Sequence, residues 1–202
     1  MANDNADIRN FVEKIKFETL VVPAAREILH AELKDLFEHW TELRGRRFAP
    51  AWSAFDWDGV PPRLVPHCAT VEVRRNPLDF VYVYWGVGRK VMQRGDYTGK
   101  SMRDFRPKAI AEKAIRASCE VLTQQAAICV MTESLESGHS QPFDYQFLRL
   151  PFSEDGETVS HIMGVGLYDE KVMQRAYDFY NAQPDDDVDL GALIRRLDPA
   201  AC

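Results

Sequence analysis

The chain has 202 residues, a formal net charge of −6, and a composition that is 46% hydrophobic and 28% charged. These values are typical of an ordinary globular protein and provide enough apolar material for a sizeable core. The acidic balance argues against general nucleic-acid binding, which needs a positive face for phosphate contacts. No apolar run approaches the roughly 20 residues of a membrane-spanning helix, and the N-terminus lacks the features of a secretory signal. We therefore expect a cytoplasmic protein without nucleic-acid or membrane partners.

Two helices are predicted before the first strand. A short helix is expected over residues 8–20. A longer helix is expected to begin near Pro23, because proline suits the first turn of a helix. Its apolar residues, Trp40 among them, recur at three- and four-residue spacing up to Arg44. Gly45 is expected to end this helix, since glycine accepts the positive φ of a C′ residue.

A proline-rich connector over residues 45–66 separates these helices from a run of strands. Its aromatic residues Trp52, Phe55 and Trp57 are expected to pin it to the body of the protein. Two β-rich runs around Asn76-Pro77 predict a hairpin, with strands over 69–74 and 80–88. The later elements are expected as helices over 101–105 and 107–125, strands over 128–135, 143–152 and 159–168, a helix over 171–182, and a short helix ending near Leu197.

This order of elements predicts an α+β fold. An antiparallel five-stranded sheet with helices on one face, plus N-terminal and C-terminal flanking helices, satisfies it. We divide the chain into N-terminal helices and connector over 1–66, a core over 67–168, and a C-terminal helical extension over 169–202.

Several short motifs carry a family resemblance. They are the helix end Trp40-x-x-Leu43-Arg44-Gly45-x-Arg47, Asp56 and Asp58 in the connector, Phe80-x-Tyr82 ending in Gly86, Asp96 to Lys100, and Leu148 to Gly164. In this order they resemble a bacterial, alphaproteobacterial-type family of small cytosolic PAS-like proteins. The resemblance implies a PAS-like core and a role in sensing or protein interaction. It brings no common cofactor and no catalytic residue.

A cavity in a PAS-like core lies between the concave face of the sheet and the helices. Alternation along the second predicted strand places Phe80, Tyr82 and Tyr84 on that face. Either a polar small-molecule ligand partners the tyrosine hydroxyls, or the side chains simply fill the core. The candidate pocket residues are Phe80, Tyr82, Tyr84, Ile115, Cys119, Phe147, Ile162 and Gly164.

The same alternation places Val81, Val83 and Trp85 on the opposite face of this strand. A strand that is apolar on both faces is normally covered on both. The cover is provided either by the chain's own flanking helices or by a second subunit. Because PAS-like proteins often associate through this surface, the resemblance favours a homodimer with these three residues at the interface.

Motifs for catalysis or metal binding are lacking. The histidines are scattered over different elements, and there is no HExxH motif and no CxxC pair. The glycines around GVGRKVMQRG fit neither common phosphate loop, so we expect Gly86 and Gly88 to be tight packing sites or a bulge in a strand. The cysteine motif of flavin-binding PAS domains is absent, and the helix over 107–125 offers no histidine for haem. We therefore predict no catalytic residue, no metal and no cofactor.

These observations predict a non-catalytic, PAS-like sensory or regulatory module. It works through small-ligand binding, through association with itself or a signalling partner, or through both. One alternative is a small cone-shaped α+β enzyme of the ketosteroid-isomerase kind, for which His161 or Asp144 is the arguable catalytic group. The other alternative is a purely structural dimerisation protein.

Overall fold

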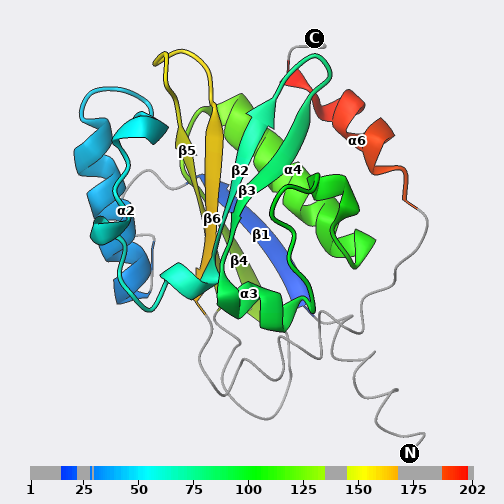
Figure 1. Ribbon diagram of the computed structural model, residues 1–202, viewed down its shortest axis with the longest axis horizontal. Coiled ribbons are helices and arrows are strands. Elements are labelled where there is room, and N and C mark those ends of the chain that lie inside the picture. Colours follow the sequence, from blue (N-terminus) through cyan, green and yellow to red (C-terminus); the bar gives the residue numbers. More distant parts are fainter. Residues whose placement is uncertain (1–14, 22–27, 29, 135–144, 168–187, 200–202) are drawn as a thin grey trace, which may run out of the picture.

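The computed structural model describes residues 15–21, 28, 30–134, 145–167 and 188–199 (Figure 1). Six strands form one antiparallel sheet in the order β1-β4-β5-β6-β2-β3. The strands are β1 (Ile15–Val21), β2 (Cys68–Arg74), β3 (Asp79–Trp85), β4 (Ile128–Ser134), β5 (Tyr145–Phe152) and β6 (His161–Leu167). The α-helices are α2 (Ala31–Arg44), α3 (Val87–Met92), α4 (Lys108–Gln124) and α6 (Leu190–Leu197). Short 3-10 turns span Trp52–Ala54, Trp57–Gly59, Val65–His67 and Met102–Asp104.

The five predicted strands are all present as β2 to β6, and they lie side by side in a single antiparallel sheet. Their order along the chain, with α4 between the first two and the last three, is the predicted α+β, PAS-like arrangement. This confirms the fold class. The domain limits at residues 66 and 168 stay predictions. Within the described residues, no helix combines the length and apolar character needed to cross a membrane.

The sheet carries a sixth strand, β1, that the sequence pattern did not predict. Residues 15–20 were expected to be helical, and this prediction is wrong. The whole of β1 pairs with the edge of β4, from Ile15 opposite Ser134 to Val21 opposite Ile128. Apolar and polar residues alternate over Ile15-Lys16-Phe17-Glu18, which is the strand period. The helix predicted for residues 8–14, the start expected near Pro23 and the helix over 171–182 lie outside the described residues.

Helices cover both faces of the sheet (Figure 1). On one face, here called the α4 face, α4 and α6 pack over Phe80, Ile162 and their neighbours. On the opposite α2 face, α2 and the connector pack over Leu148 and its neighbours. Trp40 is buried there, and its Nε1 donates a hydrogen bond of 2.8 Å to the carbonyl oxygen of Pro151 in β5. The chain's own elements therefore cover this face over β5 and β6, whereas the homodimer stays a prediction.

The connector is held to the α2 face by its aromatic residues, as predicted. Trp52 makes an edge contact with Phe152 of β5, with ring centroids 5.1 Å apart. Phe55 meets the same ring at 5.1 Å. Trp57 packs on Tyr84 of β3 at 4.5 Å. These contacts join a segment without long helices to the sheet.

A β-bulge in β3 reverses the predicted alternation. Thr70 of β2 pairs with Tyr84 and the next residue, Val71, pairs with Tyr82, so Val83 is an extra residue. Consequently Tyr82 and Trp85 both belong to the cluster on the α4 face, whereas Tyr84 packs on the α2 face. The predicted sides of Tyr84 and Trp85 are wrong for this reason. The strand also ends at Trp85, and α3 begins where the strand was expected to continue.

Candidate functional site

The structure brings most of the predicted pocket residues together on the α4 face, where they are closely packed. Phe80, Tyr82, Ile115, Cys119 and Ile162 belong to one buried cluster. Tyr84 does not join them, because the bulge turns it to the α2 face, where its hydroxyl donates to the carbonyl oxygen of Val65 at 3.2 Å. Phe147 and Gly164 lie next to each other on β5 and β6. A ligand pocket formed by these residues stays a prediction.

Two glycines seat α3 against the segment before β2. A Cβ at Gly86 would lie 2.3 Å from the carbonyl oxygen of Pro66, and one at Gly88 would lie 2.9 Å from Cε1 of His67. A larger residue at Gly86 would collide with the backbone and push α3 away, so glycine is required there, and Gly88 leaves little room beside His67. The prediction that both are tight packing sites is confirmed, although they belong to a helix start rather than to a strand. This seating directs Arg89, in the middle of α3, into the protein.

Arg89 is buried, with only 6% of its surface exposed. Its guanidinium carbon lies 4.8 Å from the ring centroid of Trp85 and 5.2 Å from that of Phe147. Its Nη1 donates a long hydrogen bond of 3.5 Å to the carbonyl oxygen of His67. Its Nε is buried without any hydrogen-bond partner. No carboxylate of the described residues forms an ion pair with Arg89, and a buried unpaired charge is costly.

Two neighbours of Arg89 also have buried polar atoms without hydrogen-bond partners. The indole Nε1 of Trp85 is buried without a hydrogen bond, and so are both Oε1 and Nε2 of Gln93. Gln93 follows Arg89 by one helical turn, and its backbone N–H donates to the Arg89 carbonyl oxygen at 2.9 Å. Residues four apart lie on the same face of a helix. Unsatisfied polar atoms therefore concentrate along one side of α3 and at the strand end before it.

A second arginine extends this region onto the sheet. Arg149 of β5 is 9% exposed, and its guanidinium carbon lies 4.7 Å from the ring centroid of Phe147. Gly164 of β6 pairs with Arg149 and leaves room for both side chains. A Cβ there would lie 2.8 Å from Cε1 of Phe147 and 3.4 Å from Nη1 of Arg149. We call Trp85, Arg89, Gln93, Phe147 and Arg149 the α3 site.

The electrostatics of the α3 site are positive. Burial lowers the pKa of His67 from its ordinary value, and the charges of Arg89 and then Arg63 lower it further. Burial raises the pKa of the Cys68 thiol to about 12, although Arg89 acts in the opposite direction. Neither neighbour therefore supplies a negative charge at neutral pH. The site offers the Arg89 guanidinium and the N–H donors of Trp85 and Gln93, and these three side chains hold four buried polar atoms without hydrogen-bond partners.

The sequence pattern missed Arg89 and Gln93 and placed Trp85 on the wrong face. The detectable signal was the four-residue spacing of Trp85, Arg89 and Gln93 together with glycines that allow a helix to start. Arg89 then falls on the buried side of that helix, and Val87, Lys90 and Val91 fall on the exposed side. Because β3 is hydrophobic up to Trp85, the change from the strand period to the helix period at Val87 was not recognised.

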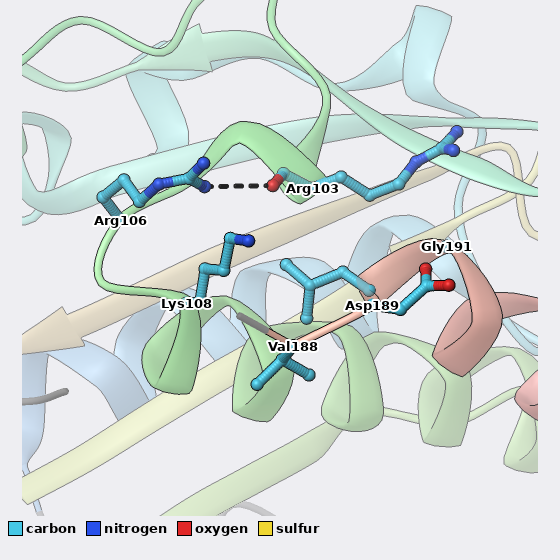
Figure 2. Close-up of a pocket in the computed structure, with 7 residues that line it drawn as sticks. Arg103, Arg106, Lys108, Val188, Asp189 and Gly191 are labelled. Atoms are coloured by element: carbon cyan, nitrogen blue, oxygen red, sulfur yellow. Dashed lines mark hydrogen bonds between the residues drawn. The ribbon is translucent and has the colours of Figure 1, made fainter. Parts of the chain in front are cut away.

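A separate surface pocket of about 430 Å³ lies between the starts of α4 and α6 (Figure 2). Figure 2 shows Arg106 donating to the carbonyl oxygen of Arg103, at 3.3 Å, while the Arg103 guanidinium points away. That guanidinium pairs with Asp79, with Nη2 and Oδ2 2.7 Å apart. Asp189, across the pocket, accepts the N–H of Ala192 at the start of α6. Arg103 and Asp189 on the pocket lining are thus already engaged in structural contacts.

The groups named for an enzyme do not gather on the α4 face. His161 stacks on Trp52 of the connector, with ring centroids 5.0 Å apart. Burial lowers the pKa of His161, while the charges of Glu72 and Glu154 oppose this shift. Asp144 lies outside the described residues. In the part of the chain that the structure describes, no three His, Cys, Asp or Glu side chains converge as a metal site.

Comparisons with known proteins give little beyond this geometry. No protein-family model matches the chain. No curated protein matches it either. Among solved structures, the chain is similar to an RNA-binding Light-Oxygen-Voltage receptor, with 16% sequence identity and a TM-score of 0.40. The match covers 90% of this chain and 44% of the receptor, so the chain spans less than half of that protein's length. The resemblance to the bacterial PAS-like family stays a prediction from the sequence motifs.

Proposed function

We propose that this chain is a non-catalytic sensory or regulatory module that binds a small ligand at the α3 site. The observation that carries the proposal is the set of four buried polar atoms, in Trp85, Arg89 and Gln93, without hydrogen-bond partners. Buried polar groups in native proteins are nearly always paired, and exceptions call for an explanation. A ligand that complements these atoms explains why they are retained beside an otherwise apolar cluster. The PAS-like architecture supports the same role.

The two faces of α3 suggest how binding is transmitted. Arg89 and Gln93 face the site, while Val87 and Val91, one turn apart on the other side, are 63% and 69% exposed. A ligand that favours one seating of α3 therefore changes the position of an exposed apolar surface. The mechanism is a population shift between two positions of one short helix.

Association with a partner protein, or between two copies of the chain, is the second route to a signal. Of the three residues expected at an interface, Val81 and Trp85 are buried and Val83 is 40% exposed. Val83 on β3 is followed along the chain by Val87 and Val91 on α3, and all three valines are exposed. We propose these three valines, rather than the originally expected set, as the surface through which a homodimer or a signalling partner is recognised.

Native and denaturing mass spectra of freshly purified protein test the ligand-binding proposal. A bound ligand gives a native mass that exceeds whole subunits by a fixed small amount, and this excess is lost on denaturation. Trp85→Phe and Gln93→Leu are each expected to reduce the fraction of protein that carries this excess, since each removes groups that lack partners. A bare native mass, combined with no stabilisation by any small molecule in a broad screen, would contradict ligand binding. A bare dimer would instead favour a protein that acts by association alone.

A further inference from the structure

We infer that the α3 site binds the oxyanion group of a small organic molecule, a carboxylate or a phosphate, through Arg89. This inference rests on the proposed ligand-binding function and specifies the chemistry of the ligand. It is drawn from the charge, the hydrogen-bond donors and the aromatic neighbours of the site.

Arg89 brings a buried positive charge to the site, and no described carboxylate compensates it. A guanidinium stays protonated at any relevant pH, and this one is 6% exposed. The described residues give it two aromatic faces, Trp85 and Phe147, and no carboxylate. An aromatic face attracts a cation, but it leaves the Nε–H without an acceptor in the ring plane of the guanidinium. An oxyanion supplies both the missing charge and the missing acceptor.

The hydrogen-bonding groups of the site are mostly donors. Arg89 Nε, Trp85 Nε1 and Gln93 Nε2 are donors without partners, against a single acceptor, Gln93 Oε1. A ligand group rich in acceptors fits this ratio. Carboxylate and phosphate oxygens match the edge of a guanidinium, where charge-assisted hydrogen bonds are short and strong.

The side chains that contact the guanidinium are aromatic, which suits the carbon skeleton of an organic acid. The rings of Trp85 and Phe147 border the guanidinium, and Tyr97 lies 5.1 Å from the Trp85 ring. In β6, glycines stand opposite Arg149 and Phe147, at positions 164 and 166. A site for a fully hydrated inorganic ion does not need aromatic walls, whereas an organic anion gains from burying apolar surface against them.

Thermal unfolding of the full chain at constant ionic strength tests the inference. Sodium acetate, sodium benzoate and sodium phosphate are the probes, and sodium chloride balances the ionic strength. We expect at least one probe to raise the Tm of the wild type in a saturable manner, and the shift to be lost in Arg89→Gln. Benzoate or acetate acting alone identifies a carboxylate, and phosphate acting alone identifies a phosphate. Arg196→Gln, at an exposed position on α6, is the matched control and keeps the full shift.

The variant has a second signature that separates binding from packing. Without any probe, Arg89→Gln is expected to melt no lower than the wild type, because it removes a buried charge that has no carboxylate partner. Equal probe-induced shifts in the wild type and Arg89→Gln would overturn the inference. A lower Tm of Arg89→Gln, with no probe effect on the wild type, would make Arg89 a packing residue and would also overturn it.

Two further outcomes distinguish this inference from the function on which it rests. If mass spectra reveal an uncharged ligand whose binding no oxyanion affects, ligand binding stands and the oxyanion inference fails. If no ligand and no shift are found, both fail. If Arg89→Gln does not fold, Gln93→Leu takes its place, since a probe-induced shift that this variant leaves unchanged would also contradict the assigned site.

Discussion

Gly164 leaves room for the Phe147 ring on the α4 face because it has no Cβ. A Cβ there would lie 2.8 Å from Cε1 of Phe147 and 3.0 Å from its Cζ. Gly164→Ala should therefore displace the Phe147 ring and destabilise the fold by about 1–3 kcal/mol, the usual cost of overpacking. Denaturant unfolding measures the change. Gly95→Ala is the matched control, because its Cβ would meet nothing closer than Tyr97 Cε2 at 3.6 Å, and a control loss as large as that at 164 would refute the steric explanation.

His161 makes the stability of the fold depend on pH. Burial lowers its pKa in the folded state, against the opposing charges of Glu72 and Glu154, so the unfolded chain binds its proton more readily. Stability contributed by neutral His161 is thus complete above the unfolded pKa of about 6.5 and is lost as pH falls below it.

His161→Phe tests this dependence. The substituted ring preserves an aromatic stack on Trp52 and cannot be protonated. We expect the fall in Tm between pH 7 and pH 5 to be smaller in the variant than in the wild type. His67, whose pKa burial also lowers, maintains the remaining slope. An identical slope in both proteins would mean that the charge of His161 does not affect folding.

At the scale of elements, α2 is attached to the sheet chiefly through Trp40. The side chain is 3% exposed and its Nε1 donates to the Pro151 carbonyl oxygen at 2.8 Å. Trp40→Ala removes the ring and leaves that acceptor without its donor, so we expect a loss of about 3–5 kcal/mol. Glu42→Ala, at an exposed position of the same helix, should change stability by less than about 0.5 kcal/mol. Urea unfolding of both variants checks the difference, and a loss below about 1 kcal/mol in Trp40→Ala would contradict the packing role.

Local sequence pattern was enough for the elements whose period is regular. The helix α4 and the strands β2, β4, β5 and β6 were predicted to within a few residues, because each shows one clear period or clear turn residues at its ends. Strand β1 was missed because the alternation over Ile15 to Glu18 is short and because its ladder with β4 joins residues far apart in the chain. Such pairing depends on an open sheet edge that no local window contains.

The candidate site was harder to predict, because it depends on two irregular features. The extra residue Val83 places Tyr84 on the α2 face and Trp85 on the α4 face, the reverse of the prediction. The hydrophobic periodicity of the sequence did not indicate this bulge. The short helix α3 then began two residues after the strand. Arg89 consequently entered the interior, although a charged residue after a strand is usually exposed.

At the scale of the whole molecule, one sheet supports two cores. Phe80, Ile115 and Ile162 are in the cluster of the α4 face, and Leu36, Leu148 and Met163 are in that of the α2 face. Neighbouring residues of the same strand, Ile162 and Met163 in β6, contribute to opposite clusters. Loss of the sheet therefore exposes both cores together, and we expect the two layers to unfold as one cooperative unit.

Three buried thiols report on this cooperativity, since Cys68 and Cys129 lie in the cluster of the α2 face and Cys119 in that of the α4 face. Burial raises the pKa of each thiol to about 12, so the reactive thiolate is scarce in the folded state. Under native conditions at pH 8, we expect all three to resist a thiol reagent for as long as the protein stays folded.

In increasing urea, peptide mass mapping should show the three labelling rates rising together along the global unfolding curve. Labelling of Cys119 well below the urea concentration at which Cys68 and Cys129 react would show that α4 and α6 open alone. The face that carries Arg89 and Phe147 would then be the less stable layer. In that case a ligand bound on the α4 face would act most strongly on α4 and α6, because they open first. The conformational change that carries the signal would then involve these helices rather than α3.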